Sequence, residues 1–212
     1  MKKILAILSM IFIFSFFLTF KNYAQEQIIC IDPGHGGVDG GATIGDYKES
    51  NLNLDYANTL KSILENKGYK VVMTRTNDKH LSGEKFIKKL DLEERLKIIN
   101  NSNCLLFISL HMNKFEEEQY SGAQTFYYPS FKENKELAFM IQESIKLHMS
   151  NTTRDIKEIE SVFLLKNATK IGCLVECGFM SNKEELNNLL SLEYKYKLCD
   201  AIAVGIQSFI TR

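Results

Sequence analysis

Four side chains that could share a metal ion and a water molecule stand at comparable places in the sequence. His35 follows the apolar run IICID, His111 follows CLLFISL, and Glu176 ends the run IGCLVE. Glu49 lies directly before a predicted helix, in the loop that starts after IICID. Catalytic zinc commonly takes two histidines and one carboxylate as ligands and leaves a position for water, while a further carboxylate can serve as general base. The residue types therefore fit a hydrolase with one zinc ion.

The glycine-rich stretch IDPGHGGVDGGA around His35 has a second interpretation as a phosphate-binding loop. A dinucleotide-binding loop needs G-x-G-x-x-G leading directly into a helix, and a P-loop needs Gly-Lys followed by Ser or Thr. Here the third glycine is displaced, and no helix is predicted to begin before residue 50. The phosphate-binding interpretation therefore fails. The glycines are predicted instead to let the backbone turn tightly and approach a metal or substrate closely.

The elements that must position these residues alternate between strands and helices, which predicts one domain with a three-layer α/β/α sandwich around a mostly parallel sheet. In such sheets the ligand site lies beyond the carboxyl ends of the strands, where His35, His111 and Glu176 are expected to converge. Predicted strands cover residues 27–32, 69–75, 104–110, 122–128, 161–166 and 171–177. Predicted helices cover residues 50–68, 84–101, 133–150, 183–190 and 192–210.

The composition bounds the kind of partner and the compartment. The chain has 212 residues with 26 basic and 26 acidic side chains, so nothing in its charge favours nucleic acid as a partner. Residues 1–24 combine a basic start with a short apolar run and predict a signal peptide or a membrane anchor, with cleavage left open. Residues 25–212 are then the catalytic domain, which is expected to act outside the cytoplasmic membrane.

The five cysteines are an odd number and cannot all pair within one chain. Cys30, Cys104 and Cys173 lie in predicted strands and are expected to be buried free thiols. Cys173 and Cys177 have a spacing seen in zinc sites, but no second pair accompanies them. The cysteines are therefore predicted to be structural.

The motifs IDPGHGGVDGGA, KESNLNL, SLHMN and VECGFMSNKEE resemble, in this order, the signature blocks of the zinc-dependent N-acetylmuramoyl-L-alanine amidases known as amidase family three. The resemblance extends over about residues 27–211. It implies that His35, Glu49 and His111 bind one Zn²⁺ and that Glu176 is the catalytic carboxylate. It also implies hydrolysis of the amide between the lactyl group of N-acetylmuramic acid and the L-alanine of the stem peptide.

Within that family the chain is similar to the amidases that prepare spore-cortex peptidoglycan, whose products a muramic acid deacetylase converts to muramic-δ-lactam. The resemblance implies peptidoglycan strands with stem peptides as substrate and action in the cell wall or the forespore intermembrane space. Because no wall-binding repeats accompany the catalytic domain, a separate extracytoplasmic protein is expected to position or activate the enzyme. Arg75 and Asp78 are expected to form an ion pair that ties a loop, and Arg95 is expected to act in the same structural way. Two alternatives are a catalytically inactive peptidoglycan-binding domain of the same fold and another zinc peptidase.

Overall fold

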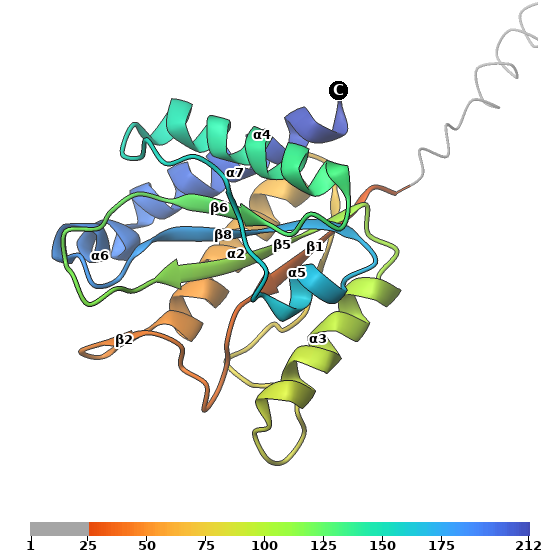
Figure 1. Ribbon diagram of the computed structural model, residues 1–212, viewed down its shortest axis with the longest axis horizontal. Coiled ribbons are helices and arrows are strands. Elements are labelled where there is room, and N and C mark those ends of the chain that lie inside the picture. The colour runs from red at the N-terminus through yellow and green to blue at the C-terminus, as the bar shows by residue number, and fades with distance from the viewer. Residues whose placement is uncertain (1–25) are drawn as a thin grey trace, which may run out of the picture.

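A six-stranded sheet forms the middle layer of the protein in a computed structural model that describes residues 26–212 (Figure 1). The strand order is β4-β1-β5-β8-β6-β7. All neighbouring strands in this order pair in parallel except β8 and β6, which pair antiparallel. This confirms the mostly parallel sheet. Its strands are β1 (Ile28–Pro33), β4 (Lys70–Met73), β5 (Leu106–Asn113), β6 (Gln124–Tyr127), β7 (Lys157–Glu158) and β8 (Ile171–Phe179). A separate small hairpin pairs β2 (Thr43–Ile44) with β3 (Tyr47–Lys48).

Helices cover both faces of the sheet, as the sandwich prediction requires (Figure 1). On one face lie α2 (Glu49–Asn66), α4 (Lys132–Met149), α6 (Lys183–Leu190) and α7 (Leu192–Ile210). On the other face lie α3 (Lys88–Asn101) and α5 (Phe163–Asn167). Among residues 26–212, no helix combines the length and the apolar character needed to cross a membrane. The predicted leader at 1–24 lies outside the described residues.

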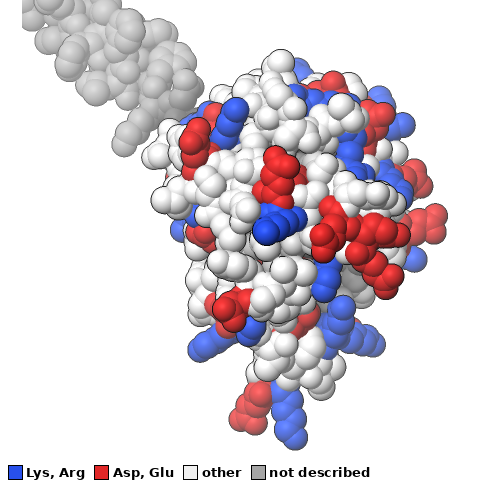
Figure 2. All heavy atoms as spheres, turned by 90° about the vertical axis from the view of Figure 1, so that its left-hand side faces the viewer, with Lys and Arg blue, Asp and Glu red and all other residues white. Residues whose placement is uncertain are grey.

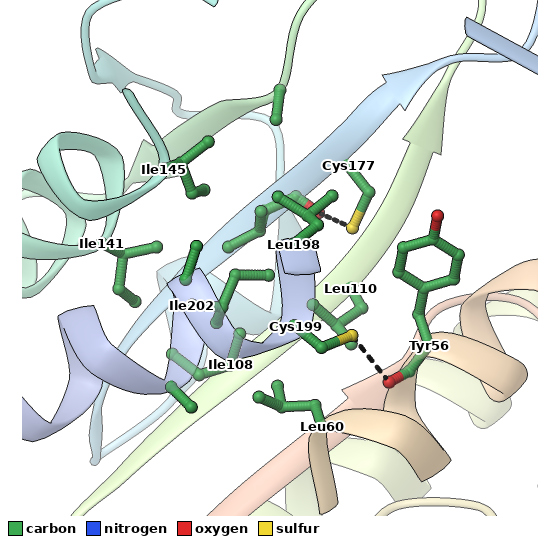
Figure 3. Close-up of a cluster of buried hydrophobic side chains, with 14 of the residues drawn as sticks. Tyr56, Leu60, Ile108, Leu110, Ile141, Ile145, Cys177, Leu198, Cys199 and Ile202 are labelled. Atoms are coloured by element: carbon green, nitrogen blue, oxygen red, sulfur yellow. Dashed lines mark hydrogen bonds between the residues drawn. The ribbon is translucent and has the colours of Figure 1, made fainter. Parts of the chain in front are cut away.

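The larger core forms where α2 and α7 pack on β5 and β8 (Figure 3). Tyr56, Ile108, Leu110 and Ile202 are fully buried in it. Burial of each large apolar side chain of this kind contributes about 1.5–3 kcal/mol. All five cysteines are buried and free, which confirms them as structural thiols, and Cys199 Sγ lies 3.5 Å from the Tyr56 carbonyl oxygen that accepts its hydrogen bond.

The strand predicted at 161–166 is wrong. The chain forms helix α5 there, whose Leu164 and Leu165 pack into the smaller core between the sheet and α3. An apolar run of this length fits a strand or a buried helix equally well, and both edges of β8, the next strand in the chain, are already paired, with β5 and β6. The remaining predicted strands and helices are present, with ends displaced by a few residues.

Candidate metal centre and catalytic carboxylate

Two histidines and one glutamate converge at the carboxyl ends of β1 and β5. His111 lies in the last part of β5, His35 follows β1, and Glu49 is the first residue of α2. Glu49 Oε1 is 3.3 Å from His35 Nε2 and 2.9 Å from His111 Nδ1. One donor atom from each residue lies within 4.8 Å of the other two. Three side chains from distant parts of the sequence therefore form a cluster that fits one metal ion.

The Glu49 carboxylate is held in place from both sides. Its Oε2 accepts a hydrogen bond from Ala42 N at 2.8 Å, and its Oε1 accepts from Asn53 Nδ2 at 3.2 Å and from Met112 N at 3.3 Å. Burial alone would raise the pKa of Glu49, but the hydrogen bonds and charges of His111 and His35 outweigh it and hold that pKa well below its usual range. An anionic oxygen and two imidazole nitrogens form a donor set that suits zinc.

The His35 loop is held in a backbone conformation that side chains other than glycine rarely adopt, with a φ of 61° at His35. Arg95 Nη2 donates to the His35 carbonyl oxygen at 2.5 Å, and Arg75 Nη2 donates to the Gly34 carbonyl oxygen at 2.9 Å. Asp39 Oδ2 lies 3.0 Å from His35 Nδ1, on the side of the ring opposite the Nε2 atom that faces Glu49. A carboxylate in this position orients a metal-binding histidine.

Two glycines allow the close approach that the sequence predicts. A Cβ atom on Gly34 would lie 2.2 Å from the His111 ring. A Cβ on Gly41, whose φ is +64°, would lie 2.4 Å from Glu49 Oε2 and 2.8 Å from the His35 ring. Any larger residue at either position would displace a predicted ligand.

The expected ion pair between Arg75 and Asp78 is wrong. Arg75 donates to carbonyl oxygens, from Nε to Pro33 at 2.9 Å and from Nη2 to Ser50 at 2.8 Å, in addition to Gly34. The Asp78 carboxylate accepts from Gly37 N at 2.9 Å instead. A guanidinium has five donors in a fixed fork, which here meet main-chain oxygens of the turn after β1 and of Ser50 at the start of α2.

Arg95, in contrast, forms the structural ion pairs that the sequence led us to expect. Its Nη1 lies 3.0 Å from Asp32 Oδ1 and its Nε lies 2.8 Å from Asp91 Oδ2, with all three side chains buried. Burial would raise the pKa of Asp32, and the Arg95 charge together with the Thr74 and Ser109 hydroxyls lowers it overall. The network fixes the end of β1 directly before the His35 loop.

Glu176 lies on β8 directly opposite His111 in the β5–β8 register. Its Oε2 is buried without a hydrogen-bond partner among the described residues, and burial raises the pKa of Glu176 to about 7. Glu176, His35 and His111 line the same cavity of about 260 Å³. The arrangement can therefore hold a metal ion beside a carboxylic group that gains and loses a proton near neutral pH.

Comparison with known proteins identifies the family of the chain. A family model described as N-acetylmuramoyl-L-alanine amidase matches residues 29–208. The chain belongs to this family. It is an N-acetylmuramoyl-L-alanine amidase, a hydrolase of the peptidoglycan amide bond between N-acetylmuramic acid and L-alanine. The resemblance seen in the sequence motifs is thus confirmed.

Individual relatives match nearly the whole described part of the amidase. The germination-specific N-acetylmuramoyl-L-alanine amidase of Bacillus subtilis is 40% identical over 190 residues, covering 87% of this chain and 80% of that protein. The CwlD amidase of Clostridioides difficile, solved in complex with the GerS lipoprotein, has a TM-score of 0.84 and 36% identity, covering 88% and 99% of the two chains. A further amidase structure from Clostridium difficile 630 has a TM-score of 0.80 and 28% identity, covering 89% and 98%.

The sequence analysis missed three contributors to the amidase site. Asp39 was not assigned a role, although its place four residues after His35 is a usable signal. Asn53 was not singled out, although it lies one helical turn after Glu49 and donates to it. The segment before α5 also lines the cavity, and its misassignment as a strand concealed this.

Proposed function

We propose that the amidase binds one zinc ion through His35, Glu49 and His111 and uses Glu176 as its general acid and base, within a catalytic domain that covers residues 25–212. The observation that carries this proposal is the cluster of three ligand atoms within 4.8 Å, with Glu176 directly opposite His111 on the neighbouring strand. The two nitrogen donors and one anionic oxygen donor support zinc rather than Mg²⁺ or Ca²⁺, which prefer oxygen ligands.

In the proposed mechanism the protein positions the lactyl–alanine amide between the ligand cluster and Glu176. When bound, zinc supplies a Lewis acid that polarises the amide carbonyl and activates the attacking water. Glu176 removes a proton from that water as its oxygen bonds to the carbonyl carbon. Glu176 then delivers the proton to the alanine nitrogen as the C–N bond breaks, which leaves a lactyl carboxylate and a free stem peptide. A pKa near 7 suits a group that must perform both transfers.

We further propose a role in the spore cortex. The name of the Bacillus subtilis relative and its 40% identity support this role. The substrate would be peptidoglycan of the cell wall or the forespore intermembrane space, reached by export through the leader at 1–24, whether cleaved or retained as an anchor. A muramic acid deacetylase would then act on the denuded sugars. The GerS lipoprotein in the structure of the CwlD amidase supports an extracytoplasmic accessory protein for this chain also.

The experiment that tests the site combines metal analysis with digestion of muropeptides followed by mass spectrometry. Glu176→Gln should retain one zinc per chain and lose hydrolysis, whereas His111→Ala should lose both. The expected wild-type product is a peptide with a free N-terminal L-alanine. Substantial turnover by Glu176→Gln would refute its role, and unchanged zinc in His111→Ala would refute the ligand set.

The same digestion distinguishes the alternatives. A zinc-loaded wild-type chain that binds peptidoglycan without cleaving it would support an inactive binding domain. Cleavage inside the stem peptide would support a peptidase. Full activity and full zinc loading of the purified chain without any partner would contradict the need for an activating protein.

A further inference from the structure

The cavity that contains Glu176 extends away from the ligand cluster into a space between α3 and α5, which lie on the same side of the sheet (Figure 1). Its volume of about 260 Å³ is below the range of about 300–1,000 Å³ typical of sites that enclose a whole ligand. The cavity therefore fits one arm of the substrate beside the scissile amide. The walls away from the metal ligands are formed by Lys88, Asp91, Leu92, Ser161, Val162, Phe163, Leu164 and Leu174.

The charges on these walls do not balance. Asp91 is neutralised within the fold, because its carboxylate pairs with Arg95 Nε at 2.8 Å and accepts from Leu81 N at 2.6 Å. Lys88 on the same wall has no salt-bridge partner among residues 26–212. Lys88 is also the first residue of α3, whose N-terminus has no side-chain cap and adds partial positive charge. On the part of the lining that lies away from His35, Asp39, His111 and Glu176, Lys88 is thus the one charged side chain without a salt-bridge partner among the described residues, and most of its neighbours there are apolar.

An unpaired cation beside the mostly apolar end of the cavity, between α3 and α5, favours an anionic group on the part of the substrate that enters there. N-acetylated sugars whose lactyl group carries a stem peptide have no charge. The stem peptide does, because its second residue, a D-glutamate linked through its side chain, keeps a free α-carboxylate. The positive charge of Lys88 therefore favours the stem peptide, which carries a carboxylate, over the uncharged glycan as the part of the substrate that enters this cavity.

We propose that the cavity between α3 and α5 binds the first residues of the stem peptide, with the alanine methyl against the apolar wall and Lys88 paired with the carboxylate of the second residue. This subsite rests on the amidase function proposed above. The face on which β5 ends carries exposed side chains of both signs (Figure 2), so its overall charge would not orient the substrate by itself. Lys88 then determines the specificity of the enzyme for the acidic form of the stem.

The test uses the purified full chain and two sets of short glycan strands with tripeptide stems. In one set the second residue is D-glutamate with a free α-carboxylate, and in the other that carboxylate is amidated. Lys88→Met removes the proposed partner. Lys89→Met is the matched control, because Lys89 is next in α3 but pairs with Glu93 and does not line the cavity. Both lysines are exposed, so folding and zinc content should match the wild type.

On the acidic stem, Lys88→Met is expected to raise KM about tenfold, as loss of one charge-assisted contact would, with kcat within about twofold. On the amidated stem, the wild type should already show the higher KM, and Lys88→Met should cause no further change. Lys89→Met should match the wild type on both. An equal loss for Lys88→Met on both stems, or no loss on either, would overturn the subsite while leaving the amidase function intact. A zinc-loaded wild type that cleaves neither stem, with or without extracytoplasmic proteins of the source cell, would refute the amidase function itself.

Discussion

Replacing Arg95 by methionine tests whether the buried ion network holds the metal-binding loop. The side chain is 2% exposed and makes four hydrogen bonds, two to carboxylates and two to main-chain oxygens. Methionine has a similar length but leaves Asp32 and Asp91 buried without their cation, and it releases the carbonyls of Pro33 and His35. Removing one partner from a buried ion pair costs about 3–5 kcal/mol, a large part of a typical stability of about 5–15 kcal/mol.

Arg75→Met gives the matched comparison. Arg75 is also buried, but it donates only to carbonyl oxygens. Two of these keep another donor without it, because Pro33 O still accepts from Arg95 and Gly34 O still accepts from Asn53. We therefore expect a cost of about 1–3 kcal/mol, clearly less than that of Arg95→Met.

The cost of Arg95→Met should also depend on pH in a defined direction. In the wild type the folded pKa of Asp32 is below its unfolded value of about 3.9, so its stabilisation is present above that pH and is lost as the pH falls through the folded pKa. Without the guanidinium, burial raises the pKa of Asp32, and the folded variant takes up a proton that the unfolded chain does not. The stability difference between wild type and variant should therefore be smaller at pH 5 than at pH 7.

The assay is urea unfolding of the zinc-free proteins at both pH values, together with zinc titration of each folded variant. Zinc affinity should fall for Arg95→Met because His35 loses the contact that fixes its carbonyl. Arg95→Lys keeps a cation beside Asp32, so its free energy of unfolding is expected to lie between those of the wild type and Arg95→Met. It replaces Arg95→Met in the comparison if the methionine variant does not fold. If Arg95→Met lowered the free energy of unfolding by less than about 1 kcal/mol relative to the wild type, the reasoning would be refuted. A loss of the same size at pH 5 and pH 7 would refute the assigned role of Asp32.

Two further predictions concern the shape of the ligand cluster. Gly41→Ala should lower zinc affinity by tenfold or more, measured by competition with a chelator, because the new Cβ would meet Glu49 Oε2 and the φ of residue 41 is positive. Gly45→Ala is the control, because Gly45 also has a positive φ but has open space where a Cβ would lie. Equal loss of zinc affinity in both variants would contradict the steric argument. Asp39→Asn should weaken zinc binding about 10–100-fold with little change in unfolding free energy, and unchanged zinc binding would show that Asp39 does not orient His35.

The sequence alone predicts the sheet and the meeting of the ligands for a simple reason. Buried parallel strands appear as continuous apolar runs, and their carboxyl ends must share one edge of the sheet. His35 and His111 follow such runs, and the structure brings both within reach of Glu49. Glu176 belongs to the same edge through the β5–β8 register, so its position could be predicted although its partners are far away in the chain.

The failures concern contacts that no local pattern encodes. The run at 161–166 is apolar enough for a strand, but it forms the short helix α5, whose Leu164 and Leu165 are buried in the smaller core. Arg75 was expected to pair with Asp78, but it donates to the main-chain oxygens of Pro33 and Gly34 in the turn after β1. Both outcomes depend on which groups the fold brings together, a property of the assembled structure.

One guanidinium connects the metal centre to the cavity proposed for the stem peptide. Arg95 binds the carbonyl of His35 on one side and Asp91 on the other, and Asp91 lines the cavity wall and holds Leu81 N. Arg95 therefore supports the loop that carries His35 and also fixes Asp91 on the cavity wall. An apolar side chain at this position would leave Asp32 and Asp91 buried without their cation, so Arg95→Met is expected to disturb both the His35 loop and this wall of the cavity.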